Sequence, residues 1–160
     1  YEDTAEILRK YGFHQYEISN YARDGFECRH NKGYWQRTEY LGAGLGAASL
    51  FQGKRFSNTR DMQTYLADST EPKKIREDVT TLTRNNEIEE FMFLGLRMTE
   101  GISERQFEKN FGCRIEDIYG SVLAKYKEMD LLEHTGEFWH FTRKGIHVSN
   151  PVLADFLLDE

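Results

Sequence analysis

Cysteine, proline and long apolar runs are scarce or absent in this sequence of 160 residues. Its two cysteines, Cys28 and Cys113, are too few for the disulfide framework of a secreted protein. Its two prolines exclude the proline-rich and collagen-like classes. Charged residues make up 30% of the chain, and no stretch approaches the ~18 consecutive apolar residues of a membrane-spanning helix. We therefore expect a protein of the reducing cytoplasm with no membrane span.

Excess positive charge is also absent, because the chain carries a net charge of −6. Residues 1–70 contain 9 basic and 9 acidic side chains, so the whole acidic excess lies in residues 71–160. A nucleic-acid-binding protein needs basic side chains to neutralise phosphates, and we therefore expect no nucleic-acid partner. Hydrophobic residues make up 39% of the chain, which suffices for one domain or two small ones at about 100–200 residues each.

The first third of the chain has the pattern of part of an α/β protein. A helical pattern runs to Tyr11 and ends at Gly12, and residues 15–18 resemble a strand. A helix, a glycine and a strand are half of a βα repeat, so we expect a fragment of a longer α/β protein. The alternative is a small α+β domain that is complete in itself. Polar residues 19–32 predict a loop, and residues 41–51 predict a glycine-containing strand.

The second half of the chain predicts mostly helices. The segment 85–98 has apolar residues at helical spacing, and residues 115–126 carry an almost unbroken apolar stripe. Between them, Ser103 and Gln106 fit the two ends of a capping box. A β-hairpin pattern follows over residues 131–141. Three helices followed by a hairpin are the outline of a winged-helix module.

The patterns of the two halves change across residues 69–78, which are charged and read as a linker. The predicted organisation is α+β, with one domain over residues 1–70, a linker over 71–83 and a mostly helical, winged-helix-like domain over 84–160. The presumed recognition helix, residues 114–130, has three basic and four acidic side chains. Because a DNA-reading helix presents a basic face to phosphates, this helix is better suited to packing on a partner domain.

Two clusters hold residues able to carry chemistry. The segment Gly42–Ala47 fits G-x-G-x-x-A, but a dinucleotide fingerprint must open a helix, and the residues that follow predict a strand and a turn. Its small residues permit close approach of a flat ligand or of a neighbouring strand, and both interpretations stay open. Cys28-Arg29-His30 lacks the partner cysteines of a zinc site. From composition alone, His30 is therefore expected to be an ordinary loop histidine.

Six stretches of the chain together form a recognisable set of motifs, namely Tyr16–Ala22, Cys28–Asn31, Tyr34–Trp35, Tyr40–Ala47, Glu89–Arg97 and Phe141–Gly145. This set resembles the oxygen-independent coproporphyrinogen III oxidase-like family of radical SAM proteins, and the resemblance covers nearly the whole chain. The pattern H-N-x-x-Y-W is closer to the HemW branch, regarded as haem chaperones, than to the HemN oxidases.

The resemblance implies a fold, a function and cofactors. The fold would be the remnant of a radical SAM (β/α) barrel followed by a winged-helix-like C-terminal domain. The parent protein would bind a [4Fe–4S] cluster, S-adenosylmethionine (SAM) and a tetrapyrrole such as haem. The fragment lacks the cysteine motif of the cluster, so we expect it to bind no cofactor and to catalyse nothing without the missing N-terminal barrel. A true coproporphyrinogen III oxidase and a non-enzymatic helical interaction module remain the alternatives.

The resemblance also implies site residues. It points to His30 as a candidate ligand of haem iron and to Asn31, Tyr34 and Trp35 as further tetrapyrrole contacts. It places three small residues on the strand that faces SAM, namely Gly44, Gly46 and Ala47. Many relatives have Gly-Ala-His-Ser after this strand, whereas Ala48 replaces the histidine here. Any role of that histidine is therefore in doubt for this chain.

Overall fold

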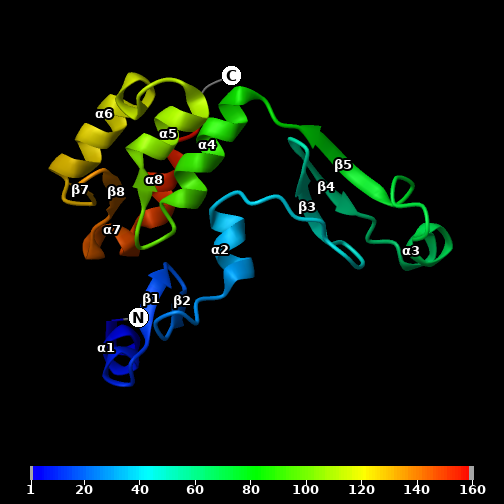
Figure 1. Cartoon of the computed structure of the whole chain (residues 1–160), viewed down its shortest axis with the longest axis horizontal. Coiled ribbons are helices and arrows are strands. Elements are labelled where there is room, and N and C mark those ends of the chain that lie inside the picture. Colours follow the sequence, from blue (N-terminus) through cyan, green and yellow to red (C-terminus); the bar gives the residue numbers. More distant parts are fainter. Residues whose placement is uncertain (1, 159–160) are drawn as a thin grey trace. The chain divides into compact units, whose positions relative to one another are not determined.

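The computed structural model describes residues 2–158 and has α+β architecture (Figure 1). Its contacts divide the chain into two compact units. The split unit comprises the residues up to 36 together with those from 88 onward, and the inserted unit comprises residues 37–87. The units differ from the expected domains, because the first 36 residues share a unit with the C-terminal helices.

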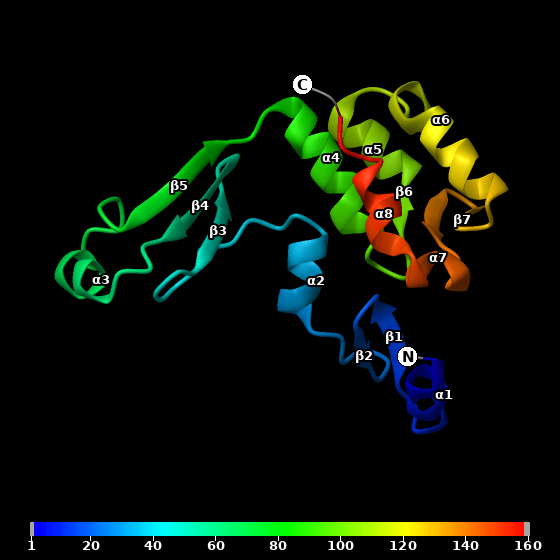
Figure 2. The ribbon, with the colours of Figure 1, turned by 180° about the vertical axis from the view of Figure 1, so that it is seen from behind.

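The split unit contains most of the helices (Figure 2). Its elements are α1 (Glu2–Lys10), β1 (His14–Glu17), β2 (Asn20–Ala22), α2 (Arg29–Trp35), α4 (Arg84–Gly95, which begins in the inserted unit), β6 (Ile102–Ser103), α5 (Glu104–Phe111), α6 (Ile115–Glu128), β7 (Leu132–Thr135), β8 (Phe138–Phe141), α7 (Arg143–His147) and α8 (Ser149–Ala154).

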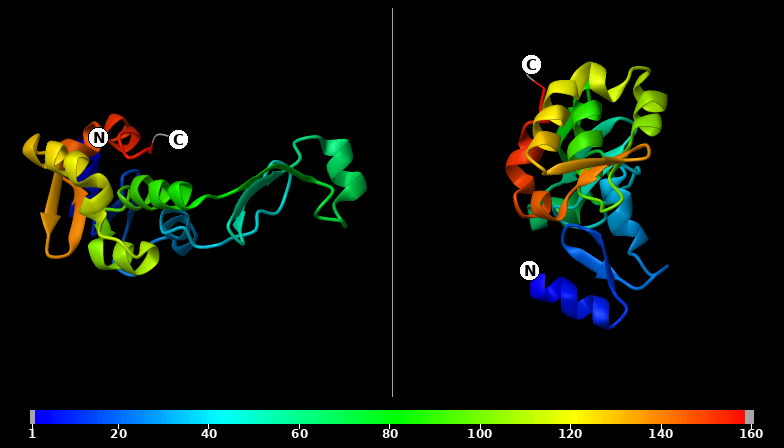
Figure 3. Two further views of the ribbon diagram at one scale, coloured as in Figure 1. Left: turned by 90° about the horizontal axis from the view of Figure 1, so that it is seen from above. Right: turned by 90° about the vertical axis from the view of Figure 1, so that its left-hand side faces the viewer.

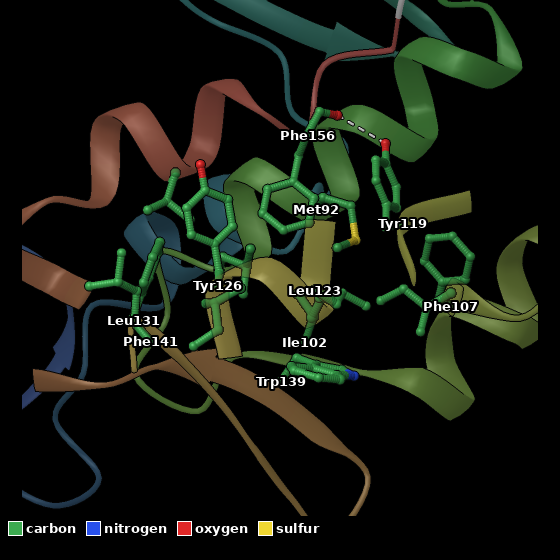
Figure 4. Packing of buried hydrophobic residues seen from close by; sticks show 14 of the residues in the cluster. Met92, Ile102, Phe107, Tyr119, Leu123, Tyr126, Leu131, Trp139, Phe141 and Phe156 are labelled. Carbon is green, nitrogen blue, oxygen red and sulfur yellow. Dashed lines mark hydrogen bonds between the residues drawn. The ribbon is translucent and has the colours of Figure 1, made fainter. Parts of the chain in front are cut away.

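The core of the split unit forms around α6, as the apolar stripe predicts. Ile115, Tyr119 and Leu123 are each 1% exposed, and they pack against α4, α5, α8 and the sheet (Figure 4). The Tyr119 hydroxyl donates a hydrogen bond to the carbonyl of Phe156 at 2.9 Å, which fixes the C-terminal segment on the core. Burial raises the pKa of Tyr119, so its phenol stays neutral in the folded state.

Capping explains where α5 begins and ends. Ser103 Oγ accepts a hydrogen bond from the amide of Gln106 at 3.1 Å, which confirms half of the predicted capping box. The other half is wrong, because the Gln106 side chain bonds to Asn110 one turn further on. Gly112, with a φ of +69°, ends the helix in the left-handed conformation.

The predicted hairpin over residues 131–141 is confirmed as β7 and β8, which turn at Gly136 with a φ of +64°. Strand β6 pairs antiparallel with β8, so the sheet order is β6-β8-β7. The chain order is thus α4, β6, α5, α6, β7, β8, and the helices lie against this small sheet (Figure 3).

The inserted unit is an antiparallel sheet of β3 (Ala48–Phe51), β4 (Lys54–Asn58) and β5 (Arg76–Thr81), with α3 (Met62–Asp68) between β4 and β5. Strand β5 corrects the prediction of a linker over residues 71–83, because it pairs with β4. Charged residues begin this strand, and almost all of it is exposed at the sheet edge. Exposed edge strands often carry charged residues. The sequence of such a strand therefore looks like that of a linker, which explains the wrong prediction.

Two further predictions in the first third of the chain were wrong. Residues 19–32 include β2 and the start of α2. The amide of Ser19 donates to the Glu17 carboxylate, so this polar turn reverses the chain into a hairpin. Residues 41–51 form a strand only from Ala48, since Gly44 and Gly46 have positive φ values that a strand does not accommodate.

We expect Gly145→Ala to destabilise the protein by at least about 2 kcal/mol, because a tightly packed site does not admit an extra methyl group. A Cβ at residue 145 would lie 1.9 Å from the carbonyl oxygen of Leu131. Gly120 in α6 is the matched control, since a Cβ there would come no closer than 3.8 Å to its nearest neighbour. Gly120→Ala should stabilise by about 0.5–1 kcal/mol. Urea unfolding of both variants measures the difference, and equal stabilities would contradict the packing at Gly145.

We expect Asp155 to stabilise the fold only above acidic pH. Hydrogen bonds from Lys125 at 2.6 Å and from Tyr126 at 2.7 Å lower the pKa of its carboxyl. The stabilisation is therefore present above the unfolded pKa of about 3.9 and is lost as the pH falls through the lower folded value. Asp155→Asn should reduce the melting temperature at pH 7, and the difference from wild type should vanish near pH 2. A difference independent of pH would show that ionisation is irrelevant.

Candidate functional site at helix α2

Helix α2 carries the four residues that the sequence assigns to a tetrapyrrole, and it presents them on two faces. His30 and Tyr34 are one turn apart, and the Tyr34 hydroxyl lies 2.6 Å from His30 Nε2. Their rings meet edge to face with centroids 4.6 Å apart. Asn31 and Trp35 are also one turn apart but contact other elements of the split unit. Residues four apart share a helix face, so the four side chains form two separate pairs.

The outer pair is accessible. His30 is exposed and Tyr34 is half-buried. An imidazole and a phenol in contact on an accessible surface offer one nitrogen and one oxygen to a ligand. Both groups are known axial ligands of haem iron.

The inner pair holds α2 in place. Asn31 Nδ2 donates to the hydroxyl of Tyr16 at 3.2 Å. The guanidinium of Arg97 lies over the Trp35 ring, 4.4 Å from its centroid. Trp35 also packs against a small cluster of Tyr16, Ala22 and Met98. Its ring therefore covers protein atoms, and it does not share the outer face with His30.

A buried carboxylate lies next to this inner pair. Glu17 is 0% exposed, and its Oε1 accepts hydrogen bonds from the amide of Ser19 and the side chain of Asn20. Its Oε2 is 3.7 Å from Arg97 Nη2. Burial of a carboxylate is costly unless it is paired and hydrogen-bonded. Here Oε1 is hydrogen-bonded, whereas the buried Oε2 accepts no hydrogen bond and has the 3.7 Å ion pair with Arg97 as its compensation.

Backbone pairing brings these groups together. Strand β1 lies antiparallel to the segment after α4 through a bridge between Glu17 and Met98. The amide of Ile18 donates to the Arg97 carbonyl at 3.0 Å, and that of Thr99 donates to the Tyr16 carbonyl at 3.2 Å. Sequence reasoning assigned no role to Glu17 or Arg97. The available signal was a charge inside an apolar stretch, as in Tyr16-Glu17-Ile18 and Leu96-Arg97-Met98.

The small residues predicted to face SAM belong to the inserted unit, and they precede β3 rather than lying on a strand. The Asn58 side chain donates to the carbonyls of Gly42 and Gly44 at 3.1 and 2.9 Å. The amide of Gly46 donates to the Thr59 carbonyl, and the carbonyl of Ala47 accepts from the amide of Asn58. These polar groups bind within their own unit, so they do not support hydrogen bonds to SAM, and the predicted contact stays a prediction.

The described part of the chain contains neither a group of metal-ligating side chains nor a helix that could span a membrane. Among residues 2–158, no three histidine, cysteine or acidic side chains gather as a metal site. The chain has two cysteines, the exposed Cys28 and the half-buried Cys113. A [4Fe–4S] cluster is held by more thiolates than two, so these cysteines alone do not fit such a cluster. No helix among these residues is long and apolar enough to cross a membrane.

We expect Arg97→Met to destabilise the protein by about 3 kcal/mol, because it leaves a buried carboxylate without its cation. Arg105→Met is the matched control, since Arg105 is exposed on α5. Adding Glu17→Gln to Arg97→Met should restore part of the loss, as the uncompensated charge disappears. Urea unfolding measures all three. If Arg97→Met were as stable as the control, the buried pair would contribute nothing.

Comparison with known proteins identifies one known domain in this chain and several related proteins. Residues 82–148 match the HemN C-terminal domain. The chain is 39% identical over 160 residues to the Heme chaperone HemW of Lactococcus lactis subsp. lactis, covering 100% of this chain and 42% of that protein. It is 34% identical over 157 residues to the Heme chaperone HemW of Bacillus subtilis, covering 98% and 41%. The chain thus spans about two-fifths of these curated relatives.

A solved structure shares the fold. The coproporphyrinogen III oxidase HemN from Escherichia coli, a radical SAM enzyme, superimposes with a TM-score of 0.75 at 17% identity. The match covers 98% of this chain and 39% of that one. The recognition made from the sequence motifs is confirmed: the chain belongs to the HemN/HemW family, and residues 82–148 are its HemN C-terminal domain.

Proposed function

We propose that this chain is the C-terminal part of a HemW-like radical SAM protein that binds haem in the cytoplasm. The observation that carries the proposal is the 39% identity to a haem chaperone over the full length of the chain. The identity to HemN is only 17% and supports the fold alone. The comparison therefore favours a haem carrier over a coproporphyrinogen oxidase.

The parent would take its cluster and SAM from a radical SAM region outside this chain. That region is the main partner we propose. The two cysteines of this chain do not suffice for a cluster, so the chain alone would catalyse no radical reaction. Its contribution would be to hold the tetrapyrrole.

We also propose a finer description of the fold. The order α4, β6, α5, α6, β7, β8 with the sheet order β6-β8-β7 supports a winged-helix arrangement in the C-terminal domain. The elements before residue 70 would continue the barrel of the parent. The acidic balance of α6 favours packing against protein over binding DNA.

The outer face of α2 fits haem in its donor chemistry. Bound haem would supply an iron that accepts a nitrogen or oxygen ligand. His30 and Tyr34 offer both donors on an accessible surface. Asn31 and Trp35 would orient the helix from its inner face and would not contact the macrocycle.

We expect the full-length parent protein to bind ferric haem with a shifted Soret band and its His30→Ala variant to bind about tenfold or more weakly, which corresponds to ~1.4 kcal/mol or more. His147→Ala is the matched control, because His147 is also part-exposed and pairs with the acidic Glu2 on another element. Spectrophotometric titration gives the affinity of each protein. If the control lost as much affinity as His30→Ala, binding would be nonspecific histidine ligation.

A further inference from the structure

One histidine contacts two carboxylates on the segment that leads into α2. His14 begins β1, and its Nδ1 lies 2.9 Å from Asp24 Oδ1. Its Nε2 lies 3.1 Å from Glu27 Oε1. Asp24 is exposed, whereas His14 and Glu27 are half-buried. Residues 23–28 join β2 to α2, so a single imidazole contacts this joining segment at two points.

The number of protons on the imidazole decides how many of these contacts are hydrogen bonds. An ionised carboxylate only accepts hydrogen bonds, and a neutral imidazole donates from one nitrogen and accepts at the other. In either neutral tautomer, one ring nitrogen of His14 therefore presents a lone pair to a carboxylate oxygen. The imidazolium donates from both nitrogens. Both contacts are hydrogen bonds only when His14 is protonated, whichever tautomer the neutral ring adopts.

The two carboxylates are ionised across the range in which histidine titrates. Ordinary aspartate and glutamate side chains lose their protons at about pH 4. A hydrogen bond from its own backbone amide lowers the pKa of the Glu27 carboxyl, and hydrogen bonds from His14 and from the amide of Gly25 lower it further. Lys32 on α2 adds a weaker attraction to Glu27. Of the three groups in contact, only His14 therefore changes its charge near neutral pH.

Nearby charged and titratable groups make contacts of their own. The Arg23 guanidinium lies over the Phe13 ring, 5.0 Å from its centroid. Lys10, at the end of α1, is 2.7 Å from an acidic side chain of its own helix. Strand β2 carries no charged side chain, and its Tyr21 lies in register with residue 15. The joining segment thus supplies the charges closest to the imidazole.

We infer that His14, Asp24 and Glu27 form a pH-sensitive clasp that holds residues 23–28 against β1. The clasp is closed while His14 is protonated. As the pH rises through the range in which histidine loses its charge, about pH 5 to 8, one of the two hydrogen bonds is lost and the segment loosens. The clasp therefore controls how firmly the chain is held just before α2 and at the exposed Phe26. It operates whether or not the protein binds haem.

Asp24→Asn distinguishes this clasp from an ordinary ion pair. An asparagine amide can either donate or accept a hydrogen bond, so it can bond to Nδ1 of the protonated and of the neutral imidazole alike. The variant should therefore keep the joining segment ordered at high pH, although it has lost a charge. An ordinary ion pair would be weakened by the same change. His14→Gln removes the titrating group and should make the order of the segment independent of pH.

The measurement is the backbone order parameter of residues 24–27 in the isotopically labelled chain at about pH 5.5 and about pH 8, on either side of the histidine range. The nitrogen chemical shifts of the imidazole report the charge of His14. In the wild type, we expect a fall from about 0.85 toward about 0.6, the values of rigid and flexible backbone. Asp24→Asn and His14→Gln should each show the same order at both pH values.

The hairpin of β7 and β8 is the matched control within the same molecule. His140 Nδ1 lies 3.6 Å from Glu133, and its Nε2 lies 3.3 Å from the Thr135 hydroxyl. Because a hydroxyl can donate or accept, neutral His140 keeps both contacts, and the order of residues 135–138 should not change with pH. Constant order of residues 24–27 in the wild type would contradict the clasp, as would a loss of order in Asp24→Asn equal to that of the wild type. An equal loss in the hairpin would show a general effect of pH and would also overturn it.

Discussion

The buried carboxylate of Glu17 is the constraint on which the arrangement of the split unit depends. A fully buried charge is tolerated only where cations and hydrogen-bond donors surround it. Its partners come from two distant parts of the chain, the turn at Ser19 and Asn20 and the guanidinium of Arg97. The N-terminal hairpin must therefore dock where Arg97 leaves α4, and the backbone pairing between β1 and residues 97–99 makes that docking specific.

This docking links the HemN C-terminal domain to the helix that carries the proposed site. Arg97 lies within the matched domain, and its guanidinium packs on Trp35 at the end of α2. Trp35 thus contributes through position: its ring holds the inner face of the helix, which leaves His30 and Tyr34 on the outer face. A domain without metal-ligating clusters of its own can still fix the geometry of a ligand site in this way.

Local patterns predicted the local parts of the structure. The stripe on α6, the hairpin of β7 and β8 and the cap at Ser103 depend on neighbours within a few residues, and the sequence shows them. Strand β5 was missed because its charged residues face water at a sheet edge. The pairing of Glu17 with Arg97 joins residues 80 positions apart, and no periodicity reports such a contact.

The candidate site shows the same difference between local patterns, which the sequence reveals, and long-range contacts, which it does not. Motif resemblance treated the four residues of α2 as one group of tetrapyrrole contacts, and only the fold separates them into two faces of the helix. The same fold explains why Ala48 need not be a defect. Ala48 is exposed at the start of β3, whereas its neighbour Ser49 is buried and accepts a hydrogen bond from the amide of Gly42. Ser49 therefore fixes the glycine-containing segment before β3 locally, whereas the side chain of residue 48 faces solvent.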